Sequence, residues 1–131
     1  MEVTKTSDLK KIKDGEVVEL PKFDDGTPFI AKLRRPSLLY LCKSGAIPNE
    51  LLAAAQEIFE GRQKGNIKNY ADVLDKVLEV ALVEPKYEEV AELLTDFQRL
   101  AIFSYTQNGV MGLQPFRKIE ELSKIGGRSK K

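Results

Sequence analysis

The apolar residues near the start of the chain fall into two short runs, at positions 17–20 and 29–33, with prolines and Asp25-Gly26 between them. An Asp-Gly pair between apolar runs is a strong hairpin-turn signal, and the flanking prolines favour short strands. We therefore predict a small β-hairpin over about residues 16–34. Since an isolated hairpin is marginally stable in water, it must pack against other elements. A short helix before it should end at Asp14-Gly15.

After the hairpin, the apolar residues recur every three or four positions, as they do in amphipathic helices. Pro36 is expected in the first turn of the first helix, and Gly45 as its left-handed C-cap. Asn49 is a plausible N-cap for the second helix. The third has the clearest stripe in the chain, and Pro85 closes that segment. The members of this stripe are Tyr70, Val73, Leu74, Val77, Leu78, Ala81 and Leu82.

The last third of the chain is helical in pattern but interrupted. Thr95-Asp96 resembles an N-cap pair, which favours a short helix over residues 87–94 and a longer one over residues 96–108. Weaker periodicity follows over residues 116–124. The predicted fold is thus mainly α (α+β): one domain over residues 1–125, with an N-terminal hairpin followed by a bundle of four to six helices. Residues 126–131 are predicted to be a disordered basic tail.

The composition narrows the chemistry. The chain contains 131 residues with no histidine and one cysteine, Cys42, so the residues for a zinc cluster or a Ser-His or Cys-His nucleophile are missing. No glycine-rich phosphate loop and no apolar run of membrane-spanning length occurs in the sequence. We therefore expect no enzyme activity, no cofactor, no metal and no membrane partner. A carboxylate-only enzyme is the weakest alternative.

Charge is balanced overall, with 21 basic and 20 acidic residues, but it is segregated along the chain. Residues 79–96 carry six carboxylates against Lys86 alone, and residues 117–131 carry six basic side chains against two glutamates. Opposite charges of this kind attract one another or a second copy of the chain. The alternative is that both segments are ordinary solvated surface.

Three phrases together resemble a known family: "LPKFDDGTPFIAKLRRPSLLYLCKSGAIPNELL", "ALVEPKYEEVAELLTDFQRLAIFSYTQNGV" and "LQPFR". They are similar to the tail assembly chaperones of long-tailed (siphovirus-type) phages and prophages of Gram-positive hosts. The resemblance covers roughly residues 16–117. Its most specific parts are "RRPS" followed by "G.IPN.LL", then "AL.EP.Y.EV" and "LTD.Q...I..Y...G". These are arrangements of caps, turns and packing residues and contain no catalytic signature.

The resemblance implies a non-enzymatic protein of the host bacterial cytoplasm that is absent from the mature virion. Such chaperones bind the tape measure protein, a very long helical polypeptide prone to aggregate, and keep it soluble. They also help to recruit tail tube protein, in many phages through a longer form made by a ribosomal frameshift. The ending "GGRSKK" suits the short form, because consecutive lysine codons are rich in A and A-rich runs favour ribosomal frameshifting. Self-association in rings or spirals would suit the coating of a rod.

A groove for helical segments needs apolar walls. The candidates are Leu39, Phe97, Phe103, Tyr105 and Phe116. Phe97 and Phe103 lie about 240° apart around a helix, so we expect one in the core and the other facing a neighbouring helix or a partner.

Arg34, Arg35 and Arg117 are candidate polar contacts to a partner. For the arginine pair the alternative is a solvated strand end with one arginine bound to a local carboxylate. A second functional hypothesis is a small nucleic-acid-binding regulator that uses the basic tail with Arg34-Arg35. No aromatic residue follows Phe116 in that tail, and single-stranded nucleic acid is usually bound by basic and aromatic residues together, so nucleic acid is not the expected partner.

Overall fold

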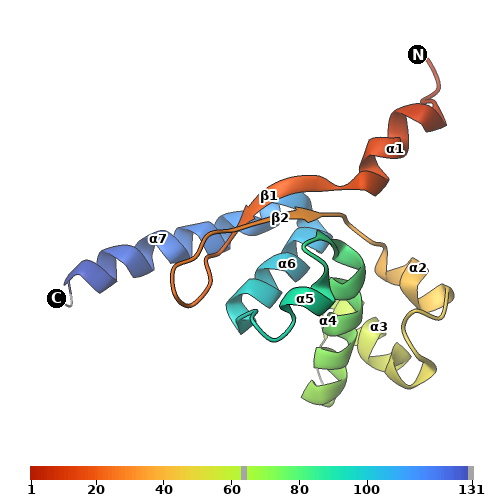
Figure 1. The fold of residues 1–131 in the computed structure, drawn as a ribbon. Helices are drawn as coiled ribbons and strands as arrows, with labels where there is room; N and C mark the ends of the chain where they lie inside the picture. Colours follow the sequence, from red (N-terminus) through yellow and green to blue (C-terminus); the bar gives the residue numbers. More distant parts are fainter. Residues whose placement is uncertain (63–64, 130–131) are drawn as a thin grey trace.

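The computed structural model describes the backbone of residues 1–62 and 65–129, and the side chains of residues 1–62 and 65–122. In this part of the chain, α1 (Thr6–Asp14) and a hairpin are followed by six α-helices, which confirms the predicted α+β class (Figure 1). The helices are α2 (Leu38–Lys43), α3 (Leu52–Glu60), α4 (Ile67–Ala81), α5 (Tyr87–Val90), α6 (Asp96–Asn108) and α7 (Gln114–Ser129). Two 3₁₀ turns, η1 (Asn49–Leu51) and η2 (Gly109–Leu113), precede α3 and α7.

The predicted hairpin is present as β1 (Glu16–Leu20) and β2 (Phe29–Leu33), paired antiparallel with Val18 opposite Ala31. Its turn forms around Asp25, whose carboxylate accepts a hydrogen bond from the Thr27 N–H at 2.9 Å. Alternate strand residues face the core, as a half-buried sheet requires. Val18, Leu20, Phe29, Ala31 and Leu33 are buried, while Val17 and Ile30 face outward.

A third strand, β3 (Leu82–Glu84), extends this hairpin to a three-stranded sheet in the order β1-β2-β3. The sequence predicted a helix through Leu82, and that prediction is wrong by one residue, because α4 ends at Ala81. Leu82 pairs with Leu33 of β2 and is only 4% exposed. A buried leucine at this position is compatible with both a helix and a strand. Hydrogen bonding to β2, about 50 residues away in the sequence, favours the strand.

Two predicted helix starts are corrected. α2 begins at Leu38, since the Ser37 hydroxyl accepts the Tyr40 N–H at 3.2 Å, so Pro36 lies before the N-cap and not in the first turn. Asn49 makes no capping contact with its side chain and begins η1, while α3 starts only at Leu52. The left-handed conformation expected of Gly45 is confirmed, with φ of 85°.

The predicted break at Thr95 is confirmed, because α5 and α6 are separate helices with Thr95 as the N-cap of α6. The predicted length of the short helix is wrong, since α5 ends at Val90 and not at residue 94. The cap is a reciprocal capping box. The Thr95 hydroxyl accepts the Gln98 N–H at 3.0 Å, and the Gln98 side-chain oxygen accepts the Thr95 N–H at 2.9 Å. Both groups would otherwise lack a partner at a helix start.

The core consists of two clusters that share α4. The first joins the inner face of the sheet to α4, α5 and α6, and the second joins α2 and α3 to Val73 and Val77 of α4. Phe103 packs against both clusters.

Two elements project from this body. α1 has no buried residue, and α7 carries the chain away from the sheet on the other side, so the two termini lie far apart (Figure 1). The backbone of α7 is helical past residue 125, where the sequence predicted the ordered part to end. Residues 130 and 131 and the side chains from residue 123 lie outside the described residues. The single domain over residues 1–125 and the disordered tail stay predictions.

Candidate binding groove

The five apolar candidates do not line one groove. Phe97 and Phe116 contact each other edge to face across α6 and α7, with ring centroids 5.1 Å apart. Tyr105 is a core residue, 2% exposed, whose hydroxyl donates to Glu16 Oε1 at 2.5 Å. Phe103 and the exposed Leu39 lie on two different surface grooves. Both Phe97 and Phe103 are half-buried, and of the two Phe103 borders the core.

The arginine pair binds main-chain carbonyls at the ends of two helices. Arg34 Nε donates to the Val80 carbonyl at 2.6 Å, near the end of α4. Arg35 donates to the carbonyls of Thr106 at 3.3 Å and Gln107 at 2.8 Å, in the last turn of α6. These carbonyls have no partner within the helix and carry the negative end of its dipole, so a guanidinium stabilises them. The arginine pair therefore binds main-chain carbonyls at helix ends, where the sequence offered a local carboxylate as the partner of one arginine.

Arg117 has a similar contact at the opposite end of the hairpin. Its Nη2 donates to the Glu19 carbonyl at 3.1 Å, and the nearby Glu120 carboxylate accepts the Lys22 N–H at 2.9 Å. Both bonds join α7 to the end of β1 and the turn that follows. Arg117 therefore positions α7 while its side chain stays largely exposed.

An open apolar groove lies between α3, α4 and α6 and has a volume of about 340 Å³. α4 forms one wall and α6 the other, and Ile58 of α3 closes one side. Two side chains at its surface are notably exposed: Ile67 at 82% and Leu100 at 52%. The remaining lining residues are Tyr70, Ala71, Leu74, Asp96, Arg99 and Phe103.

Polar contacts fix both walls of this groove. At the α4 wall, the Tyr70 hydroxyl donates to the Glu57 carboxylate and accepts the Gly65 N–H. Burial and the bond to Glu57 raise the pKa of the Tyr70 phenol. At the α6 wall, Arg99 donates to the carbonyls of Ala91 and Leu94, which belong to the α5 end and the loop before α6. The charged head of Arg99 is thereby held back, and its stem remains available to the groove.

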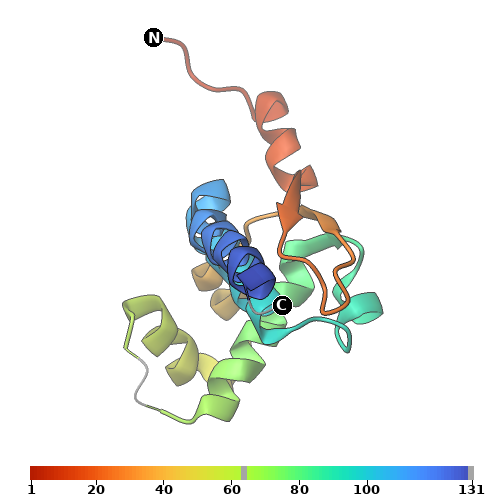
Figure 2. The ribbon, with the colours of Figure 1, turned by 90° about the vertical axis from the view of Figure 1, so that its left-hand side faces the viewer.

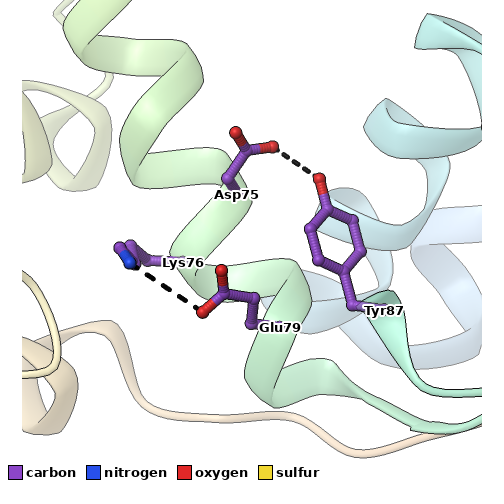
Figure 3. Close-up of polar contacts among 4 residues, drawn as sticks. All are labelled: Asp75, Lys76, Glu79 and Tyr87. Carbon is purple, nitrogen blue, oxygen red and sulfur yellow. Dashed lines mark hydrogen bonds and ion pairs between the residues drawn. The ribbon is translucent and has the colours of Figure 1, made fainter. Parts of the chain in front are cut away.

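The outer side of α4 is tied to α5 by a second tyrosine. Figure 3 shows the Tyr87 hydroxyl directed at Asp75, to which it donates at 2.6 Å. Burial, followed by this hydrogen bond, raises the pKa of Tyr87, and Arg99 partly offsets the increase. The nearby Lys76–Glu79 ion pair spans 4.0 Å on an exposed face of the same helix (Figure 3), so it contributes at most about 0.5 kcal/mol.

Sequence reasoning named Phe103 but missed its partners Ile67 and Leu100. A signal existed for Ile67, since it lies three residues before Tyr70 and continues the α4 stripe by one turn. The stripe was read only from Tyr70, whereas Asn66 is the N-cap of α4 and accepts the Lys68 N–H at 2.8 Å, so the helix begins three residues earlier. For Leu100, the packing of α6 against its neighbours decides that this face of the helix stays open.

The chain matches no protein-family profile, no curated protein and no solved structure. Among the helices in the described ranges, none combines the length and apolar character needed to cross a membrane. Within the same ranges, no three acidic, cysteine or histidine side chains are grouped closely enough to hold a metal ion.

Proposed function

We propose that this protein is a tail assembly chaperone of a long-tailed phage or prophage, and that its groove between α3, α4 and α6 binds helical segments of the tape measure protein. The observation that carries the proposal is the groove itself. It is open and apolar, and it has two helical walls. An apolar groove between two helices is the kind of surface to which an amphipathic helix of a partner binds.

The dimensions of the groove suit an amphipathic helix. The α4 wall runs from Ile67 to Leu74 and the α6 wall from Asp96 to Phe103, which is two helical turns on each side. Two turns measure about 10 Å along a helix axis. A helix bound in such a groove presents apolar anchors at positions i, i+3, i+4 and i+7, which cover the same length.

The charged groups of the groove limit how a helix binds. Asp96 and Arg99 lie on the α6 wall, one acidic and one basic, and both are near the start of that helix. Because the guanidinium of Arg99 is bound to the carbonyls of Ala91 and Leu94, Asp96 is the charged group that remains for a partner at that end. A bound segment can therefore place a basic residue beside Asp96 and its apolar stripe in the groove.

The other parts of the proposal follow from the family resemblance. The protein acts in the host bacterial cytoplasm, brings tail tube protein to the tape measure protein through a longer frameshifted form, and leaves before the virion is mature. Sequencing the gene around the stop codon tests the frameshift. A slippery heptamer with an overlapping downstream frame supports it, and the absence of both contradicts it.

Co-expression tests the groove. Fragments of the tape measure protein from the same genome are produced with and without this protein, and the soluble fraction of each fragment is measured. We expect the wild type to keep fragments with amphipathic stripes soluble. Leu100→Asp and Ile67→Asp should abolish this effect, because each places a charge in the apolar wall.

Leu93→Asp is the matched control, since Leu93 is 65% exposed and lies outside the groove lining. It should retain full chaperone activity. Circular dichroism and thermal melts establish that all three variants are folded. Fragments that precipitate equally with and without the wild-type protein would overturn the proposal, and so would groove variants that retain full activity.

A further inference from the structure

A hollow of about 350 Å³ lies where α1 meets the sheet, and it shares no lining residue with the proposed tape measure groove. α1 leads directly into β1, whose first residue pairs with the last residue of β2, so both segments meet at one end of the hairpin. In both ribbon views the C-terminal end of α1 is the part of that helix nearest the sheet (Figures 1 and 2). The hollow therefore brings Lys11 and Ile12 of α1 together with Arg34 and Arg35.

A buried floor and a close backbone contact give this α1 hollow a fixed shape. Tyr105 and Leu33 lie beneath it and are 2% and 0% exposed. Gly15 has a φ of 87°, and a Cβ on it would lie 2.5 Å from the Leu33 carbonyl oxygen. The end of α1 is thus held against β2 at a distance that only glycine permits.

The charges of the α1 hollow are unbalanced. Among the side chains that the structure describes, its lining carries Lys11, Arg34 and Arg35 against one carboxylate, that of Glu16, which accepts the Tyr105 hydroxyl. None of the three cations has a described carboxylate within ion-pair distance. Like charges gathered in this way repel one another, and an anion placed between them would remove the repulsion.

The arginines are held in position and still have donors to offer. Arg34 is bonded through Nε, and Arg35 through Nε and Nη2. Within the described residues, both Nη groups of Arg34 and Nη1 of Arg35 have no acceptor. A guanidinium with a fixed orientation and free N–H groups binds a carboxylate through charge-assisted hydrogen bonds. Since Arg34 also borders a hollow beside α5, Arg35 and Lys11 are the more specific members of this one.

An apolar wall lies beside the charges and selects the kind of anion. Ile12 lines the hollow and is 64% exposed, so a ligand can cover apolar surface there. An acidic peptide can place an apolar side chain next to its carboxylate, whereas the neighbours of a phosphate in nucleic acid are sugars and further phosphates. The volume is near the lower end of the roughly 300–1,000 Å³ of ligand pockets, which suits one or two side chains and not a helix.

We propose that the α1 hollow binds an acidic peptide segment of a partner protein, with a carboxylate between Lys11 and Arg35 and a neighbouring apolar side chain against Ile12. The inference goes beyond the tape measure site and uses none of its residues. It also gives α1 a role. A helix of nine residues with no buried residue is marginally stable, and a ligand that joins it to Arg35 would stabilise it.

Fluorescence polarisation of a short labelled peptide that alternates glutamate and leucine tests the site. We expect saturable binding to the wild type at about 0.15 M salt, where distant charges are largely screened. Lys11→Glu should weaken the binding about tenfold or more, because it removes a charge-assisted contact and introduces repulsion.

Lys10→Glu is the matched control. It changes the net charge of α1 by the same amount, but Lys10 does not line the hollow, so the affinity should stay within about twofold of the wild type. α1 has no buried residue, so both variants should fold, and circular dichroism checks this. Equal weakening by the two substitutions would overturn the proposal, since it would indicate a diffuse basic surface.

The peptide itself supplies two further comparisons. Glutamine in place of glutamate should abolish binding, and serine in place of leucine should weaken it about tenfold, because the contact with Ile12 is lost. No saturable binding of the original peptide would overturn the proposal, and so would a single-stranded oligonucleotide that binds as tightly as the peptide.

Hydrogen exchange provides a readout that a general charge effect does not move. The amide protons of α1 should exchange more slowly when the peptide is bound, and unchanged exchange at saturation would count against the proposed contact. Ile67→Asp, in the tape measure groove, should bind the acidic peptide as the wild type does. The two proposals can therefore fail separately.

Discussion

Gln98 is a buried polar residue that connects the start of α6 to the hairpin. Its side chain is fully buried and makes two hydrogen bonds. The oxygen accepts the Thr95 N–H at 2.9 Å, and the nitrogen donates to the Pro21 carbonyl at 2.9 Å. Because Asp96, Arg99 and Leu100 of the binding groove belong to the same first turns of α6, this residue also positions the groove wall.

Replacing Gln98 with alanine removes both bonds and leaves the Thr95 N–H and the Pro21 carbonyl without partners. Each unsatisfied buried group costs about 1–3 kcal/mol. Removing the side chain also leaves a small cavity. We expect the free energy of unfolding to fall by about 3–4 kcal/mol, which for a chain of this length lowers the melting temperature by roughly 10–15 °C.

Gln98→Glu is the more specific change because it preserves the shape of the side chain. An ionised carboxylate still accepts the Thr95 N–H but cannot donate to the Pro21 carbonyl, which lies against it. The introduced carboxyl should therefore have a raised pKa in the folded protein. A raised pKa means that the stability of the variant relative to the wild type is highest below about pH 4, where the carboxyl is protonated, and falls as pH rises through the folded-state pKa.

Urea unfolding followed by circular dichroism at several pH values measures both effects. Thr95→Ala is the control for the cap alone, and should cost about 1 kcal/mol without pH dependence of its own. The reasoning is refuted if Gln98→Ala costs less than about 1 kcal/mol, or if Gln98→Glu differs from the wild type by the same amount at pH 4 and at pH 7.

Three further predictions concern stability. A Cβ on Gly112 would lie 2.4 Å from the Ser104 carbonyl oxygen, so Gly112→Ala should push η2 away from α6. The free energy of unfolding measured in urea should fall by about 1–3 kcal/mol, and an unchanged value would contradict this close approach. Arg35→Ala removes the hydrogen-bond donor from the end of α6 and should lower the free energy of unfolding by about 1–2 kcal/mol. Arg35→Lys keeps the positive charge and should lower it less. Equal decreases in the two variants would exclude a role for the charge. Burial and, second, the hydrogen bond to Glu16 raise the pKa of Tyr105 in the folded protein. The free energy of unfolding of the wild type should therefore fall above about pH 10, with this group contributing up to about 1.4 kcal/mol per pH unit. Tyr105→Phe should reduce that slope when the melting temperature is measured against pH in the alkaline range.

The elements with strong local signals were predictable from the sequence. The hairpin follows from Asp25-Gly26 between two apolar runs, and the break before α6 follows from Thr95. The long stripe of α4 predicted a helix that buries Val73, Val77 and Leu78, and all three are in the core. In these cases the physical cause lies within a few residues of the element it determines.

The missed features depend on contacts between distant segments. Leu82 forms a strand because β2 lies beside it, and the arginine pair binds the ends of two helices that follow it in the chain. The position of the groove was not predicted, because the packing of α3, α4 and α6 decides which apolar side chains stay exposed. Gln98 is an intermediate case. The Thr-x-x-Gln spacing of a capping box was visible in the sequence, but the bond to Pro21 was not.

The contacts of Arg34 and Arg35 also bear on how the protein opens. One short segment after β2 is bonded to the end of α4 and to the end of α6, while Gln98 bonds the start of α6 to the other end of the hairpin. Two adjacent residues at one end of the hairpin therefore bond it to both helices, and Gln98 adds a bond to α6 at the other end. We expect the amide protons of β2, α4 and α6 to exchange with solvent as one cooperative unit, while those of α1 exchange far earlier in the free protein.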